Sequence, residues 1–393
     1  MTDQTNDRLR YQGPAFFSYG FRPFFLSAAL FSGLAVPAWI LILTGVPDPE
    51  LLSAVRDWHV HEMVFGFLPA VITGFLLTAI PNWTDRMPIR GSELLSLWTL
   101  WLAGRVVMAV PFLSPLLSSI IDSAFLVIVA GLAWREIIAG KSWPQAPIGG
   151  LVSLYACANV LFHMWMLSRA ETDPAERMGL ALVLVLLSLI GGRVTPNFTR
   201  DFLAEQGRAE QPALVSPVDG LSVVLVAIAA LFWIIQPQAL VTGWLWVAAG
   251  LLNLVRLLRW YGWLTWREPL VLALHVGFGW VVLALLVMGG AILGVGLPIT
   301  DAIHALTTGA VGMMTLAVMT RASLGHTGRP KHAGALTTCL YLLVNVGALL
   351  RVFGPSFDSS HLVLGLAAMS WSAAYLLFAL IYGPFLLRPS LDD

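Results

Sequence analysis

The sequence predicts an all-α membrane protein, a polytopic bundle of about twelve transmembrane helices. Hydrophobic residues make up 58% of the 393 residues and charged residues only 11%, whereas roughly a quarter of a soluble domain is charged. The charged residues lie between long apolar segments rather than inside them, as bilayer-spanning helices require. The chain also has no basic patch, which excludes a nucleic-acid-binding protein.

Twelve apolar segments are each about twenty residues long, which is enough to cross a bilayer as a helix. Proline, glycine and charged residues separate them, and the shortest break lies between Pro111 and Pro115. The predicted spans are 22–45, 58–81, 92–111, 115–139, 147–168, 176–198, 217–236, 240–260, 269–294, 299–321, 333–353 and 361–387. We therefore expect one membrane domain, 22–387, between an N-terminal tail of residues 1–21 and a short tail of residues 388–393.

Lysine and arginine are distributed unevenly between the two sides of this predicted bundle. With both termini on one side, that side carries sixteen of them, whereas the other side carries only Arg56, Arg169 and Arg177. Because positively charged loops remain in the cytoplasm, we expect both termini to be cytoplasmic.

Single histidines recur within or beside these spans, and ionisable groups at membrane depth indicate function because they are costly there. An outer set is expected near the non-cytoplasmic ends of its spans: His59, His61, His163 and His304. An inner set is expected near the cytoplasmic ends: His275 and His326, with Arg193 at the same level. Both sets are candidate ligands of a metal or cofactor, because neutral imidazole suits haem iron, copper and zinc.

Other interpretations of these residues remain open. His59 and His61 are two positions apart, so on a regular helix they point in nearly opposite directions. Either this segment is extended, or the two histidines have different partners. A hydrogen bond to a neighbouring helix would also explain any single histidine. Arg105, Arg193 and Arg351 lie within spans, where they could pair with carbonyls and carboxylates or with the propionates of a haem.

A faint internal repeat relates the second predicted span to the tenth. At one fixed offset the matching pairs are His61 and His304, Gly66 and Gly309, Thr84 and Thr327, and Arg86 and Arg329. The span that follows each of them carries a single arginine. An ancient duplication would explain the pattern, and it would let His61 and His304 face each other across a central cavity.

Four segments of the chain resemble the NnrS family of integral membrane proteins. They are residues 17–25 (FSYGFRPFF), 58–67 (WHVHEMVFGF), 191–200 (GGRVTPNFTR) and 319–329 (MTRASLGHTGR). The resemblance covers nearly the whole chain. It implies a twelve-span protein of the bacterial inner membrane that binds haem, of the b type, and copper, and that is linked to the nitric oxide response and denitrification. It also implies that the six histidines of the outer and inner sets stand at the family's histidine positions.

Three functions are compatible with these residues. The first is a haem- and copper-binding membrane protein that binds nitric oxide and relieves nitrosative stress. The second is an oxidoreductase that acts on nitric oxide at a haem–copper centre, although no span contains an adjacent pair of histidines. The third is a transporter of copper or another small solute, although no Cys-Pro-Cys or nucleotide-binding motif supports an active pump. The expected partners are the lipid bilayer and nitric oxide.

Overall fold

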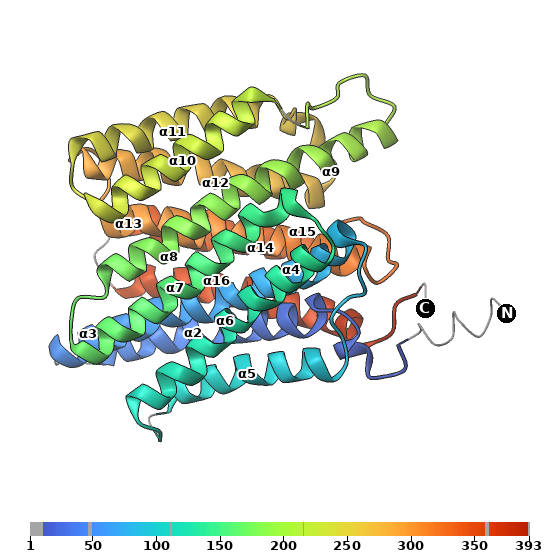
Figure 1. Ribbon diagram of the computed structural model, residues 1–393. Helices are drawn as coiled ribbons and strands as arrows, with labels where there is room; N and C mark the ends of the chain where they lie inside the picture. Colours follow the sequence, from blue (N-terminus) through green and yellow to red (C-terminus); the bar gives the residue numbers. More distant parts are fainter. Residues whose placement is uncertain (1–10, 46–48, 111, 215, 358–360, 392–393) are drawn as a thin grey trace.

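The computed structural model describes residues 11–45, 49–110, 112–214, 216–357 and 361–391, and it places most of them in helices (Figure 1). Within those ranges no strand occurs, which confirms the predicted all-α class. Residues 1–10 and 392–393 of the two predicted tails lie outside the described residues.

The long helices follow the predicted spans closely. Their bounds are α2 Phe21–Gly45, α3 Pro49–His61, α4 Leu68–Thr84, α5 Ser92–Ala109, α6 Pro115–Ala139, α7 Ala146–Ser168, α8 Asp173–Leu186, α9 Gly192–Glu205, α10 Pro217–Ile235, α11 Leu240–Leu258, α12 Pro269–Ile292, α13 Ile299–His304, α14 Gly312–Gly325, α15 Ala335–Phe353 and α16 His361–Leu387. In the described part of the chain, eleven helical stretches are long and apolar enough to cross a membrane. The third predicted span, α5, is not among them; it contains Glu93 and Arg105.

Three of the spans contain a π-helical segment that joins two α-helices. These segments are η2 (Glu62–Phe67) between α3 and α4, η4 (Leu187–Gly191) between α8 and α9, and η6 (Ala305–Val311) between α13 and α14. Segments η2 and η6 begin directly after His61 and His304, so the two spans of the sequence repeat share the same irregularity at matching positions. Because π-helical turns are frequently found at functional sites, these positions are candidates for one.

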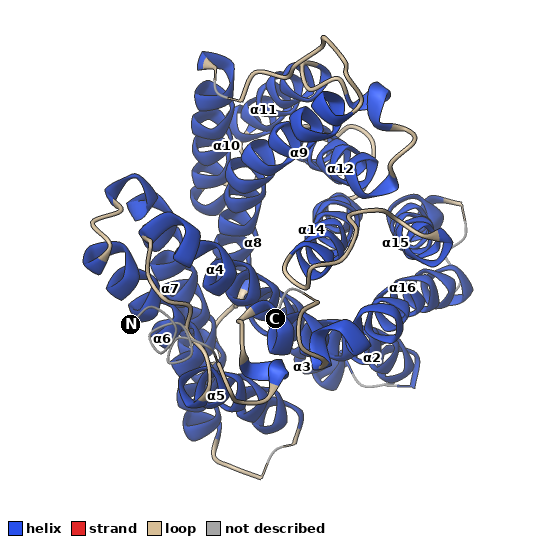
Figure 2. Ribbon diagram, turned by 90° about the vertical axis from the view of Figure 1, so that its right-hand side faces the viewer, coloured by secondary structure: helices blue, strands red, loops and turns tan. Residues whose placement is uncertain are grey.

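The π-containing spans lie at the centre of the bundle. In the most apolar part of each of these three spans, 67% to 78% of the residues are buried. The value for α12 is 67%, and for the other candidate spans it is 44% or less. Figure 2, a view along the helices, shows α4, α8 and α14 surrounded by α5 to α7, by α10 to α12, and by α15, α16 and α2. The histidines on the central spans are therefore held between helices rather than against lipid.

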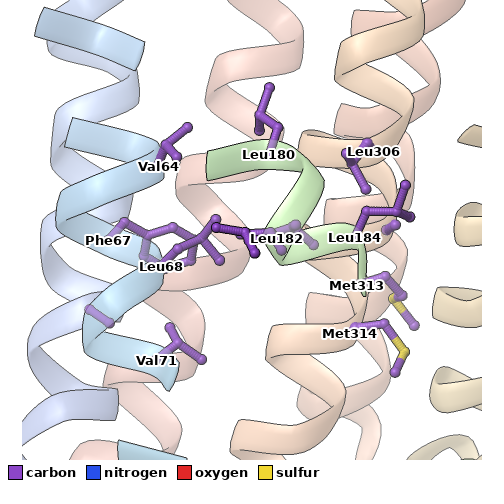
Figure 3. Packing of buried hydrophobic residues seen from close by; sticks show 14 of the residues in the cluster. Val64, Phe67, Leu68, Val71, Leu180, Leu182, Leu184, Leu306, Met313 and Met314 are labelled. Carbon is purple, nitrogen blue, oxygen red and sulfur yellow. The ribbon is translucent and has the colours of Figure 1, made fainter. Parts of the chain in front are cut away.

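Apolar side chains fill the space where the central spans meet. Figure 3 shows Phe67 and Leu68 extending toward Leu182 of α8, with Leu184, Met313 and Met314 beyond it. These residues belong to one continuous buried cluster. This packing fixes the spacing between η2, α8 and η6, which carry or adjoin the candidate site.

The start of α2 and the end of α16 lie at the same end of the bundle (Figure 1). The Arg22 guanidinium donates hydrogen bonds to the carbonyl oxygens of Phe385 and Leu386, at 3.2 and 3.1 Å. The backbone N–H of Leu391 donates to the Thr327 carbonyl at 3.1 Å. The twelve predicted spans, with α5 counted as the third, would place both ends of the described chain on one side in this way.

Candidate functional site

The segment with two histidines is a regular α-helix up to His61 and a π-helix from Glu62 onward. An extended segment is therefore excluded, and His59 and His61 face different surroundings, as the second interpretation of their spacing requires. His61 is fully buried, whereas His59 is partly accessible and lines a cavity.

This cavity lies among α2, α3, η2, α8, α13, η6, α15 and α16. Its lining is mostly apolar, with residues such as Val64, Leu180 and Trp371. The ionisable residues in the lining are His59, Glu176, His304 and Arg351. An apolar lining with a few placed polar groups is typical of a ligand or cofactor site.

The two histidines of the cavity are held in different ways. Nδ1 of His304 donates to the Thr300 carbonyl oxygen at 2.7 Å. In the neutral ring this leaves Nε2 with a lone pair, which is how proteins orient histidines that bind metals. The ring of His59 instead stacks on Trp39, with centroids 4.7 Å apart and planes 10° apart. His304 is therefore fixed by a directional bond, whereas His59 is fixed by packing.

Arg351 also lines this cavity, from α15. Its Nη1 donates to Oδ1 of Asp301 at 2.8 Å, so one carboxylate on α13 holds the guanidinium beside the cavity. A guanidinium in this place can pair with an anionic group of a bound molecule.

A second group of polar side chains, here called the polar cluster, lies on η2, α3, α5, α6 and α7. It consists of His61, Glu62, Arg105, Asp122, Asn159 and His163. Oδ2 of Asp122 lies 3.1 Å from Nε2 of His61 and 2.8 Å from Nε2 of His163. All six side chains are buried. Such a network within a membrane-spanning bundle indicates function.

Arg105 connects the two carboxylates of the polar cluster. It donates to Oε2 of Glu62 at 2.6 Å and also to Oδ1 of Asp122. Asn159 donates from Nδ2 to Oδ2 of Asp122 at 3.0 Å. Sequence reasoning did not single out Asp122 or Asn159. The signal for Asp122 was present, because it is a carboxylate in the second turn of a predicted span.

The inner residues do not form one centre. Nε2 of His275 lies 2.7 Å from the Thr199 hydroxyl, which itself donates to the Thr195 carbonyl. His326 lies beside the Phe21 ring, with centroids 5.5 Å apart, and Arg193 is exposed on α9. Among the described residues, no hydrogen bond or ring contact joins these three residues.

The structure thus divides the outer set of histidines. His59 and His304 line the cavity, whereas His61 and His163 belong to the polar cluster. The repeat suggested His61 and His304 as the facing pair, but His59, two positions earlier, is the residue that shares the cavity with His304. Both histidines lie on the regular helix α3, where residues two positions apart face different sides, so only one of them can face the cavity.

The comparison with known families agrees with the sequence motifs. A family model described as NnrS protein matches residues 15–390, nearly the whole chain. A search of curated proteins with this chain found no match.

Proposed function

The chain belongs to the NnrS family, and from this premise we propose that it binds a b-type haem in the cavity and binds nitric oxide there. Membership of the family supports a membrane protein of the nitric oxide response. The observation that carries the finer proposal is one apolar cavity lined by histidines from two central spans, His59 and His304.

The residues of the cavity fit a haem. The apolar lining suits the porphyrin ring, and two imidazoles suit its iron. His304 would be the firmly held ligand, because its Nδ1–H is bonded to the Thr300 carbonyl. Arg351 would pair with a propionate, as its guanidinium lies beside the cavity and is anchored by Asp301. A haem bound here would supply an iron to which nitric oxide can coordinate.

His59 would be the exchangeable ligand. Stacking on Trp39 orients its ring, but no hydrogen bond to the described residues fixes either ring nitrogen. Loss of this ligand would therefore cost less than loss of His304. Nitric oxide is small and apolar, so it can reach the mostly apolar cavity through the lipid without a polar channel.

A nitric oxide oxidoreductase is the second candidate, because buried carboxylates lie close to the cavity. Glu62 belongs to the polar cluster, while the next residue, Met63, lines the cavity. A carboxylate at that place could deliver protons to a reaction in the cavity. A transporter is less well supported, because a mostly apolar lining does not suit a hydrated ion.

We further propose that the protein lies in the bacterial inner membrane with both termini in the cytoplasm. The asymmetry of lysine and arginine between the two sides supports this orientation. The cavity would then lie nearer the periplasmic side, since His59 and His304 lie at the end of the bundle opposite the start of α2.

The experiment is an absorption spectrum of detergent-purified protein, oxidised and reduced, from a host supplied with haem. We expect a haem band that shifts when nitric oxide is added. If the protein purified under these conditions contains no haem, the proposal is refuted and the cavity binds a different ligand. Haem that does not respond to nitric oxide would refute the nitric oxide part alone.

A further inference from the structure

The polar cluster is separate from the cavity, and its formal charges do not balance. The carboxylates of Glu62 and Asp122 face a single guanidinium, that of Arg105, and each of the three side chains is 5% exposed or less. A buried charge without compensation is costly in a medium of low dielectric constant. The cluster therefore favours one additional positive charge beside His61, whose two ring nitrogens lie 3.0 and 3.1 Å from the two carboxylates, and either a proton on this ring or a bound cation supplies it.

Three atoms of the cluster are spaced like the ligands of one metal ion. His61, His163 and Asp122 each offer one ligand atom, and these three atoms all lie within 4.8 Å of one another. Oδ2 of Asp122 lies 3.1 and 2.8 Å from the Nε2 atoms of His61 and His163. Bonds of about 2.1 Å at right angles place neighbouring ligand atoms roughly 3.0 Å apart. Oδ1 of Asn159, 3.2 Å from Nε2 of His61, offers a fourth donor.

The surrounding side chains orient these donors. Oε1 of Glu62 lies 3.0 Å from Nδ1 of His61, and a carboxylate there accepts the Nδ1–H and leaves Nε2 to bind a metal. Arg105 occupies the other oxygens of Glu62 and Asp122, so that Oδ2 is the oxygen that Asp122 presents to the histidines. Nδ1 of the buried His163 has no partner among the described residues.

We propose that His61, His163 and Asp122 bind one divalent first-row transition-metal ion. Two histidines and one carboxylate form the donor set of non-haem iron(II) sites, and zinc(II) and copper(II) also accept these ligands. The set contains no sulfur, which distinguishes it from copper(I) sites. Asn159, whose Oδ1 lies 3.2 Å from Nε2 of His61, would supply a fourth ligand. The site does not require the haem, because no cavity residue is among its ligands.

The test is elemental analysis of purified protein together with a cobalt(II) titration of metal-depleted protein, followed by absorption spectroscopy. We expect one ion per chain beyond any haem iron, and one cobalt(II) bound with the spectrum of nitrogen and oxygen ligands. Elemental analysis identifies whether the native ion is iron, zinc or copper. Wild-type protein that neither contains such an ion nor binds cobalt(II) would overturn the proposal.

Variants separate this site from the cavity. His163→Ala and Asp122→Asn should each weaken cobalt(II) binding at least tenfold, and Glu62→Gln, which changes only the orienting carboxylate, by about tenfold to a hundredfold. The exposed His361→Ala is the matched control. His304→Ala should keep the cobalt(II) site even where it loses haem, so failure of the haem proposal would not be confused with failure of this one. Unchanged cobalt(II) affinity in both His163→Ala and Asp122→Asn would refute the assignment.

Discussion

Replacing Gly66 by alanine adds a single methyl group and should disturb the polar cluster. A methyl group there would overlap Nη1 of Arg105, the nitrogen that donates to Glu62 at 2.6 Å. The guanidinium would have to move and leave a buried carboxylate without its partner. Breaking a buried ion pair costs about 3–5 kcal/mol.

The same substitution has a smaller favourable effect. Alanine is better than glycine within a helix by about 1 kcal/mol, so Gly66→Ala should lower the free energy of unfolding by a net of about 2–4 kcal/mol. Gly131 on α6 is the matched control, because a methyl group there has no atom within 4 Å. Gly131→Ala should be neutral or stabilise the protein by up to about 1 kcal/mol.

The assay is equilibrium unfolding in mixed micelles with increasing SDS, followed by tryptophan fluorescence. The difference between the two alanine variants is the quantity of interest, because both replace a glycine within a helical span by alanine and only Gly66 lies against Arg105. If Gly66→Ala unfolds at the same SDS fraction as Gly131→Ala, the ion pair of Arg105 does not contribute the predicted amount to the free energy of unfolding.

Three further predictions concern the two histidines of the cavity, Arg351 and His326. His304→Ala should purify with less than about a tenth of the wild-type haem, whereas His59→Ala should retain most of it; equal loss in both would contradict the different roles of the two rings. Arg351→Gln should lower haem occupancy several-fold without changing the spectrum of the haem that remains, and an altered spectrum would mean that Arg351 acts on the iron rather than on a propionate. Partial desolvation and the neighbouring Lys331 lower the pKa of His326. The unfolded chain therefore binds this proton more readily, and stability should fall as the pH drops below about 6.5. His326→Gln should reduce that loss in SDS unfolding at pH 5.5 relative to pH 7.5, and an unchanged loss would exclude His326 as its source.

The spans could be predicted from the sequence because lipid imposes a simple requirement. Every backbone polar group in the bilayer must be bonded within the helix, so apolar segments of about twenty residues between polar breaks identify the helices. The third span, α5, is the least apolar of them, and Arg105 on it is paired within the protein rather than exposed to lipid. Segment length alone reveals that a helix crosses the membrane but not what its polar residues contact.

The grouping of the histidines could not be predicted in the same way. It depends on how each helix is rotated about its axis, and the π-helical segments change that rotation in the middle of a span. His59 and His61 could be assigned to different partners from their spacing, but which of them shares a cavity with His304 depends on tertiary packing. Asp122 and Asn159 were not predicted as site residues, although a carboxylate within a span is as costly as a histidine.

The central proposal is that His59 and His304 would both be ligands of one haem in the cavity that they line. Electron paramagnetic resonance of the oxidised, purified protein tests it most directly, because two imidazole ligands give low-spin ferric iron and one gives high-spin iron. The account predicts a low-spin signal in the wild-type protein that becomes high-spin in His59→Ala. A low-spin signal that persists unchanged in both His59→Ala and His304→Ala would place the haem elsewhere and contradict the account.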